Sequence, residues 1–597
     1  MSGLTDLERV FQYHDGTKHH FNRFAPSLGY LDWASQPRPF RSFDGAPVLG
    51  LYPAPNVPAP SIEPSRVTYD RLFGESPIPP APVTAATIGH FLRYSLGLSA
   101  WKVFKGSRWS LRVNPSSGNL HPTEAYVIAG PLDIEPFDQT SGIWHYAPDR
   151  HVIERRSAFE CEAWDLAGIG ISGINVAFIV VLTSIHWRES WKYGERAFRY
   201  CQHDLGHAIA ALGLSASLCG WRLTMLPAWS QSAVGALIGV DRDEDYVEAE
   251  REEPACALLV TGGSVSDMAT RPINRGIGVE PDLLLAAVRN SRWFGRASQL
   301  SEDHVAWTFI DDVARATEDP GHTINADAEE TAELTKKTFD SAISASNVDR
   351  GIDARALILQ RRSAVALDGA SSIDRAQFLR MLARVIPSRP SRPSSPSRPE
   401  SGAPWDAVWW SPRIHFALFV HRVTGVMPGL YVLARAASAV PRLKAAFSRD
   451  FAWTPVADGF PLWLLQAGDY RSRSQRVSCD QEIAADGFFS LGMIADFAGS
   501  LDEHGPSFYR HLFWESGIVG QVLYLEAEAA GARATGIGCF YDDAVHDLLG
   551  LHGHAFQSLY HFTVGMPVED ARLTTEPGYP WENVAPGPKG PGLHGGA

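Results

Sequence analysis

An internal repeat with a spacing of 311 residues constrains the fold of this chain more than any other feature of its sequence. Identical residues recur in register across a stretch that is typical of a helix, a glycine-ended loop and a second helix. Three of the matched pairs are glycines: Gly206 with Gly517, Gly220 with Gly531, and Gly239 with Gly550. A chance likeness between two helices would match scattered apolar residues, but not glycines across a loop. The repeat therefore predicts two domains of similar fold that arose by duplication.

The length of 597 residues agrees with more than one domain, because a single hydrophobic core stops growing at roughly 250–300 residues. An apolar content of 45% and a charged content of 20% are typical of a soluble globular protein. The net charge of −14, without any basic stripe, argues against a nucleic-acid partner. No apolar run is long enough to span a membrane, and the N-terminus lacks the pattern of a signal peptide.

The six cysteines are scattered and include no C-x-x-C pair. This pattern is neither a disulfide framework nor a zinc or iron–sulfur pattern, so we expect reduced thiols in a cytoplasmic protein.

Shifts in composition predict the domain boundaries. We expect a first domain over residues 1–315 and a linker over 316–350, where Asp, Glu, Thr, Ala and Ser displace the apolar periodicity. A second domain is expected over 351–575. Within it, the Ser-Arg-Pro repeats of 385–404 predict a flexible surface insertion. The tail, 576–597, ends in Gly and Pro and is expected to be disordered.

A polar turn over residues 114–122 precedes the apolar run 125–129. Pro115 fixes its own φ, and Gly118 permits a left-handed backbone. The turn also carries short polar side chains that cap helices and order turns, namely Ser116, Ser117 and Asn119. From the residues alone, the turn is either a site for a flat polar ligand or an ordinary helix N-cap.

The order Pro-Ser-Ser-Gly-Asn-Leu-His-Pro, preceded by Arg112, resembles the flavin-contacting turn of the FMN-dependent nitroreductase superfamily. It is most similar to the SagB-type branch, the azoline dehydrogenases. The resemblance implies an α+β fold, in which each domain has an antiparallel sheet flanked by helices and a long central helix at the interface. It implies cofactor-binding roles for Arg112, Pro115, Ser116, Ser117, Gly118 and Asn119.

The two halves retain different parts of the family pattern. Arg361-Arg362-Ser363 in the second half resembles the FMN-phosphate motif, and we expect it at the start of a helix, whose dipole would favour a phosphate. The first half has only a poor copy at 38–42, and the second half lacks the serine–glycine turn at 409–416. In family dimers the flavin lies at the interface. We therefore expect an intramolecular pseudo-dimer with one FMN site, lined also by Gly536 and Gly538.

Lys192-Tyr193 lies in a run that resembles the segment assigned to proton abstraction in azoline dehydrogenases. A lysine can act as a base if burial or a cationic neighbour lowers its pKa, and Arg196 is the expected neighbour. The alternative is a solvated helix start. The residues alone leave both interpretations open, and the resemblance implies that Lys192 and Tyr193 are catalytic residues.

Two further patterns carry less weight. His203 and His207 share a helical face, but no third ligand is apparent, so we expect no metal. Instead, we expect Gly206 to serve helix packing and His207 to form a hydrogen bond. The glycines of 168–173 fit G-x-G-x-x-G, but residues 158–167 before them are typical of a helix rather than a strand, which excludes a dinucleotide fingerprint.

These observations predict an FMN-dependent oxidoreductase that oxidises azoline-like rings of a peptide or natural product. The alternatives are an NAD(P)H-dependent nitro or quinone reductase and a flavin-less pseudoenzyme scaffold. The expected partners are a small-molecule or peptide substrate and a biosynthetic complex, with no nucleic acid and no membrane. The chain would be a monomeric pseudo-dimer or a higher homo-oligomer.

Overall fold

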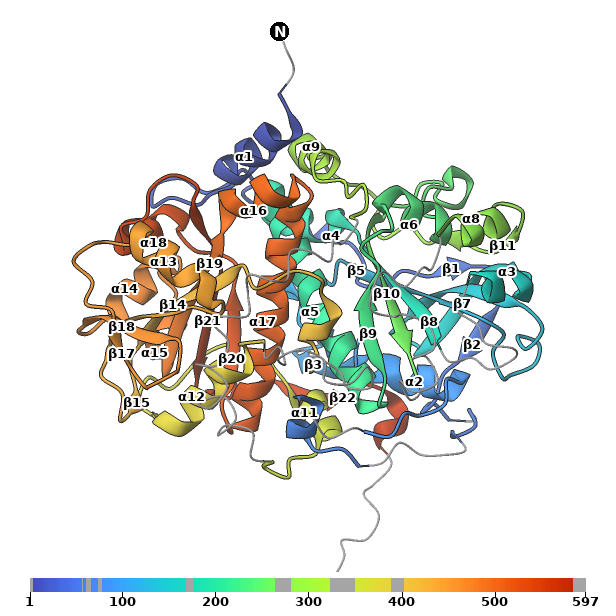
Figure 1. Ribbon diagram of the computed structural model, residues 1–597. Helices are drawn as coiled ribbons and strands as arrows, with labels where there is room; N and C mark the ends of the chain where they lie inside the picture. Colours follow the sequence, from blue (N-terminus) through green and yellow to red (C-terminus); the bar gives the residue numbers. More distant parts are fainter. Residues whose placement is uncertain are drawn as a thin grey trace, which may run out of the picture.

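The computed structural model describes residues 4–55, 57–60, 66–73, 78–167, 177–262, 281–322, 349–387 and 402–583. Two α+β halves lie on either side of a central pair of long helices (Figure 1). These helices are α5 (Ala197–Leu218) in the first half and α17 (Phe508–Ala529) in the second, each of 22 residues. The predicted fold class, two domains with antiparallel sheets flanked by helices in an intramolecular pseudo-dimer, is confirmed.

The sheet of the first half is antiparallel throughout and has the order β11-β7-β6-β5-β8-β10-β9, with β2 also pairing β7. Its strands are β2 (Val48–Gly50), β5 (Thr123–Ala129), β6 (Ser141–Ala147), β7 (Val152–Phe159), β8 (Ala177–Ser184), β9 (Arg222–Met225), β10 (Glu253–Thr261) and β11 (Arg292–Trp293). The central strands β5 and β8 are buried along their whole length, because helices cover one face and loops and short helices the other.

The second half repeats this order as β17-β18-β16-β14-β19-β21-β20. Its strands are β14 (Ile414–Val420), β16 (Gly429–Leu433), β17 (Thr454–Pro455), β18 (Leu462–Ala467), β19 (Phe489–Asp496), β20 (Arg533–Ile537) and β21 (Phe556–Gly565). In both sheets the strand that follows the turn region, β5 or β14, pairs with the strand that leads toward the long helix, β8 or β19. The second half is thus compatible with a duplication.

The repeated register extends to the helix after each long helix. α6 (Gln231–Ile238) and α18 (Asp542–Leu549) both have 8 residues. Each ends on a left-handed glycine, Gly239 with φ 73° and Gly550 with φ 74°. Such a glycine ends a helix because its backbone can turn left-handed without a side-chain clash. The predicted helix, glycine loop and helix therefore occur in both halves.

The two long helices are in backbone contact at the first matched glycine pair. A Cβ atom on Gly206 would lie 2.2 Å from the carbonyl oxygen of Trp514, and one on Gly517 would lie 2.2 Å from that of His203. Real Cβ contacts are never this close, so only glycine permits this crossing. The packing role predicted for Gly206 is confirmed.

The remaining elements surround these layers. The other strands are β1 (Phe43–Asp44), β3 (Leu98–Phe104), β4 (Ser107–Arg112), β12 (Arg296–Ala297), β13 (Ile373–Asp374), β15 (Val423–Thr424) and β22 (Thr574–Pro577). The other helices are α1 (Asp6–Gly16), α2 (Ala85–Arg93), α3 (Cys161–Leu166), α4 (His186–Tyr193), α8 (Pro281–Arg289), α9 (Thr308–Ala316), α11 (Ala354–Gln360), α12 (Arg375–Arg384), α13 (Val440–Ala446), α14 (Arg471–Val477), α15 (Ile483–Asp486) and α16 (Phe497–His504). Among the described residues, no helix combines the length and the apolar character needed to cross a membrane.

The composition of residues 187–218 predicts one continuous helix, and this prediction is wrong. The chain breaks between α4 and α5 at Gly194, whose φ is 55°. The segment at Pro26 and Ser27 lies against this break, and a Cβ on Gly194 would be 2.2 Å from the carbonyl oxygen of Pro26. Packing against a distant segment, which no local pattern reveals, places the break.

Both ends of the described chain pack on the opposite half. Helix α1 buries His14, which hydrogen-bonds Tyr509 and Gln557 of the second half. Strand β22 of the second half pairs with β3 of the first. Part of the expected disordered tail is therefore ordered, since Tyr579 is buried and Glu582 pairs with Arg93. Residues 584–597, most of the expected linker and most of the expected insertion lie outside the described residues.

We expect Gly517→Ala to destabilise the chain by at least about 2 kcal/mol, because the added methyl group meets backbone that cannot move aside. Chemical denaturation monitored by circular dichroism measures the change. Gly499→Ala in α16 is the matched control, since its new methyl group would have only side-chain atoms as close neighbours, at 3.2 Å or more. Wild-type stability of Gly517→Ala would contradict the backbone contact.

Candidate active site

The polar turn lies between β4 and β5 and has the conformation that its residues predict. Gly118 adopts φ 57° and Asn119 φ 61°, so the predicted left-handed backbone at Gly118 is confirmed. The Ser116 hydroxyl oxygen accepts a hydrogen bond from the backbone N–H of His121 at 2.8 Å. The Asn119 side-chain amide donates to the carbonyl oxygen of Ser110 at 2.9 Å. These bonds fix the turn from within.

A buried carboxylate on α5 also holds the turn in place, through hydrogen bonds to its backbone and side chain. The backbone N–H and the hydroxyl of Ser117 both donate to Asp204 at 3.0 Å. Burial raises the pKa of Asp204 to about 7. Burial and the nearby Asp204 charge also raise the pKa of Glu189 well above its usual range. Neither residue was predicted for the site; the stretch 203–207 was considered for metal binding and for packing at the interface. Within the described residues no group of side chains could hold a metal.

Lys192 and Tyr193 lie directly beside the turn. A Cβ on Gly118 would be 2.6 Å from the Tyr193 hydroxyl and 3.3 Å from the Lys192 Nζ. Burial raises the pKa of Tyr193 well above its usual range, so its hydroxyl keeps its proton at neutral pH. The predicted pair is thus brought to the turn by the end of α4.

Arg196 does not serve the predicted purpose. Its buried guanidinium lies 3.0 Å from Asp542 and also donates to the carbonyl oxygens of Thr17 and Gly538. The carboxylate neutralises its charge, while the side chain of Lys192 is exposed to solvent. The expectation that Arg196 acts on Lys192 electrostatically is therefore wrong.

The glycine loop of the second half reaches the same place. Gly538 accepts a hydrogen bond from the Tyr200 hydroxyl at 3.2 Å, and the Tyr200 ring lies 4.5 Å from that of Tyr193. Gly536 donates its N–H to the Tyr524 hydroxyl at 2.9 Å. A Cβ on Gly536 would be 1.9 Å from the Tyr560 hydroxyl, so glycine here lets the ring approach the backbone.

Residues 361–363 follow the C-terminus of α11, rather than opening a helix as expected. The negative end of the helix dipole lies there, so the dipole does not favour a phosphate. Arg361 nevertheless joins the halves: its guanidinium donates to the carbonyl oxygens of Val113 at 3.1 Å and Arg112 at 3.0 Å. These carbonyls directly precede the turn, and the Ser363 hydroxyl donates to Tyr524 at 3.0 Å.

The two adjacent guanidinium groups of Arg361 and Arg362 have the Glu528 carboxylate nearby, which accepts a hydrogen bond from the backbone N–H of Arg362 at 2.9 Å. In the described ranges they bond to carbonyl and hydroxyl oxygens but form no ion pair with a carboxylate. The Nη1 of Arg361 is buried without any hydrogen-bond partner. Burial and the neighbouring Arg361 charge lower the pKa of Arg362 to about 10. Such a donor set fits a bound anion.

Other predicted or considered residues serve the scaffold. The guanidinium of Arg112 donates to the carbonyl oxygens of Thr123 and Pro39 inside the first half. Its contact with the second half is made by its backbone carbonyl, which accepts the hydrogen bond from Arg361. His203 stacks on the Tyr560 ring at 4.1 Å, and His207 lies 3.3 Å from the Tyr560 hydroxyl. The hydrogen bond expected for His207 is confirmed. The G-x-G-x-x-G motif lies outside the described residues.

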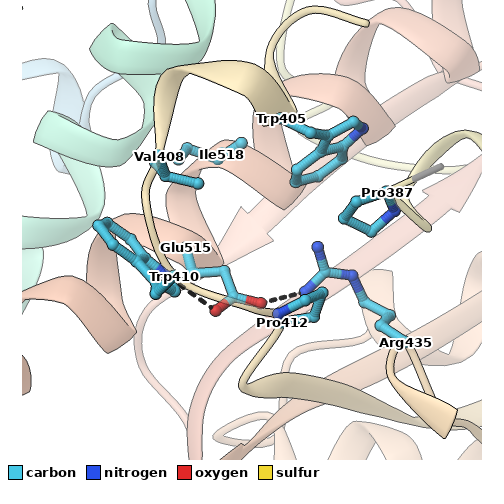
Figure 2. Close-up of a pocket in the computed structure, with 8 residues that line it drawn as sticks. All are labelled: Pro387, Trp405, Val408, Trp410, Pro412, Arg435, Glu515 and Ile518. Atoms are coloured by element: carbon cyan, nitrogen blue, oxygen red, sulfur yellow. Dashed lines mark hydrogen bonds and ion pairs between the residues drawn. The ribbon is translucent and has the colours of Figure 1, made fainter. Parts of the chain in front are cut away.

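At the corresponding position of the second half, the described residues pack around a small hollow (Figure 2). Glu515 lies 311 residues after Asp204, but it pairs with Arg435 and accepts a hydrogen bond from the Trp410 indole at 3.2 Å. Together with Trp405 they enclose a hollow of about 20 Å³. That volume suits about one water molecule and is far below that of a flavin pocket.

Comparison with known proteins agrees with this geometry. Residues 358–566 match the model of the nitroreductase family. The second half is therefore similar to the nitroreductase family over most of its length. Putative nitroreductase MJ1384 of Methanocaldococcus jannaschii is 25% identical over 163 residues, which cover 27% of this chain and 76% of that protein.

Solved structures extend the likeness to both halves. A crystal structure described as a putative nitroreductase from Anabaena variabilis has a TM-score of 0.64 at 20% identity, covering 94% of this chain and 99% of that one. A chain of the E. coli microcin synthetase McbBCD complex with truncated pro-MccB17 bound has a TM-score of 0.25 at 18% identity, covering 43% and 92%; so low a score supports no inference. The chain is an oxidoreductase with a nitroreductase-like fold.

We expect Asp204 to make the stability of the chain depend on pH. Because its folded pKa is raised to about 7, its stabilising contribution is complete below about pH 4 and is lost as the pH rises through 7. The free energy of unfolding should fall by on the order of 4 kcal/mol across this range through this group. Thermal unfolding from pH 4.5 to 8 measures the slope.

Asp204→Asn keeps an oxygen for Ser117 but removes the titration, so its slope should be flatter. The exposed Asp282→Asn serves as a control with the wild-type slope. An unchanged slope in Asp204→Asn would show that other groups cause the dependence.

Proposed function

We propose that the chain is an FMN-dependent oxidoreductase with one flavin site, built jointly by two halves that arose by duplication. One observation carries this proposal: Arg361 of the second half bonds to the two carbonyl groups that directly precede the serine–glycine turn of the first half. The two partial motifs thus adjoin across the interface, as in a family dimer. We propose the domain boundaries at 315 and 351 because the composition shifts between these positions.

The residues present fit FMN in two respects. The guanidinium groups of Arg361 and Arg362 lack a carboxylate partner in the described ranges and would hold the phosphate with the Ser363 hydroxyl. The short side chains and backbone of Ser116, Ser117, Gly118 and Asn119, with Pro115 fixing the entry to the turn, would contact the flavin ring. Bound FMN would supply a reversible hydride acceptor. Gly536 and Gly538 would line the site opposite.

For the reaction we propose oxidation of an azoline-like ring, as in the SagB-type branch. Lys192 would take a carbon-bound proton from the substrate, since its Nζ is solvent-accessible at the edge of the turn. Tyr193, which keeps its proton at neutral pH, would donate a hydrogen bond to the substrate or to the lysine. The substrate would be a small molecule or peptide, supplied in a biosynthetic complex in the cytoplasm.

One observation favours a second candidate, an NAD(P)H-dependent nitro or quinone reductase. Asp542 pairs with the guanidinium of Arg196, and the side chain of Lys192 is exposed to solvent. A reductase that only relays hydride needs no base for a carbon acid. The two candidates share the cofactor and differ in the need for Lys192.

We expect Arg362→Gln to weaken FMN binding about tenfold or more, because a charged partner of the phosphate is lost. Fluorescence titration of the flavin-free protein with FMN measures the affinity. Arg38→Gln, which changes an exposed arginine of the poor copy at 38–42, should bind FMN as the wild type does. Equal weakening in both variants would contradict a phosphate site at 361–363.

We expect Lys192→Ala to reduce azoline oxidation at least 100-fold, since positioned acid–base groups typically contribute 10²–10⁴-fold, while FMN remains bound. Product formation is followed by mass spectrometry, and bound flavin by its absorbance. Tyr193→Phe keeps the ring and tests the hydroxyl alone. Full azoline turnover in Lys192→Ala would rule out the base, and full nitro or quinone reduction would support the second candidate.

A further inference from the structure

Two cysteines from distant parts of the sequence meet next to the candidate active site. Cys479 follows α14, and Cys539 follows the glycine loop at Gly538. Their Sγ atoms lie 2.8 Å apart, closer than non-bonded sulfur atoms usually approach, and both residues are partly exposed. The pair is therefore reachable by a small molecule from solvent.

The backbone holds Cys479 toward its partner at a conformational cost. Cys479 and the next residue, Asp480, have φ values of 55° and 58°. Two successive non-glycine residues in the left-handed region cost roughly 1–2 kcal/mol each. Gln481 offsets this cost, because its side-chain amide donates to the carbonyl oxygens of Ser478 at 2.9 Å and Cys539 at 3.0 Å. The turn is thus bonded directly to the segment that carries Cys539.

A histidine completes the cluster. The Nδ1 of His19 accepts a hydrogen bond from the backbone N–H of Ala25 at 2.9 Å, so the other ring nitrogen of a neutral imidazole carries the proton. The His19 ring hydrogen-bonds Cys539. The hydrogen bond from Cys479 and that from His19 lower the pKa of Cys539, whereas the same bond raises that of Cys479. The cluster therefore favours deprotonation of Cys539 over deprotonation of Cys479.

We propose that Cys479 and Cys539 are a redox-active dithiol, which a small-molecule disulfide oxidises to an intramolecular disulfide. The Cys539 thiolate attacks one sulfur of the disulfide RSSR, forms a Cys539–S–S–R bond and releases RS⁻. The Cys479 thiol then loses its proton to the second leaving RS⁻ as it attacks the Cys539 sulfur. Two protein thiols are oxidised and one RSSR is reduced to two thiols.

The other cysteines lack this combination. Burial raises the pKa of the three thiols on α5, at its end and on β10, namely Cys201, Cys219 and Cys256. Cys161 is partly exposed, but its thiol donates to the carbonyl oxygen of Gln139 and has no second sulfur beside it. Cys161 is therefore a matched internal control for accessibility without the cluster.

The position of the pair gives its oxidation a consequence. Cys539 directly follows Gly538, whose carbonyl accepts hydrogen bonds from Tyr200 and Arg196. The Tyr200 ring in turn packs against Tyr193. A covalent link at Cys539 would displace the loop at Gly538, and this displacement would shift Tyr200 and Tyr193 at the candidate active site.

The test uses the full chain without substitutions. After exposure to excess oxidised glutathione, proteolysis under non-reducing conditions and mass spectrometry should yield a peptide linked through Cys479 and Cys539. In the reduced protein at pH 6.5, iodoacetamide should alkylate Cys539 at least about tenfold faster than Cys161, because the hydrogen bonds from Cys479 and His19 favour the thiolate of Cys539. No linked peptide while Cys161 gains glutathione, or equal alkylation rates, would overturn the proposal.

Two variants separate the roles of the sulfurs. Cys479→Ser should trap glutathione on Cys539, because the resolving thiol is absent, whereas Cys539→Ser should leave Cys479 unmodified. Glutathione on Cys479 in the second variant would overturn Cys539 as the attacking thiolate. None of these readouts needs bound flavin, so they remain informative even if the proposed function fails.

Discussion

The molecule depends on one contact, the backbone crossing of α5 and α17 at Gly206 and Gly517. Because neither glycine has a side chain, the helices approach until carbonyl oxygens and Cα atoms touch. The sheets of both halves are built outward from these helices (Figure 1). The crossing also sets the distance between the turn above Asp204 on α5 and the loop at 361–363, so it determines whether two partial motifs can serve one site.

Buried charge then orients the parts across that interface. Asp542, at the start of α18 in the second half, lies within 3.0 Å of both Arg196 and Arg199 of the first. Its other oxygen contacts include the backbone N–H of His19. Removing one partner from such a buried network leaves an uncompensated charge and is strongly destabilising. The network holds the glycine loop, the start of α5 and the N-terminal segment in one arrangement.

The sequence predicted those features whose cause is local. The repeat register anticipated both long helices and their glycine-ended loops, and Gly118 anticipated the left-handed turn. Features that arise from contacts between distant segments were missed or wrong. Arg196 is neutralised by Asp542, which lies 346 residues away. Asp204 accepts hydrogen bonds from Ser117, which lies 87 residues earlier in the chain, and no pattern near Asp204 reveals this contact.

The ends of the described chain are exchanged between the halves. Helix α1 inserts His14 among residues of the second half, while β22 extends the small sheet of the first. The covalent connection is consequently not what keeps the halves together. Two fragments separated between residues 322 and 349 would still bind each other through α1 of the first half and β22 of the second. Without the second fragment, the first would leave the edge of β3 unpaired. The assembly is best regarded as an interlocked heterodimer whose subunits happen to share one polypeptide.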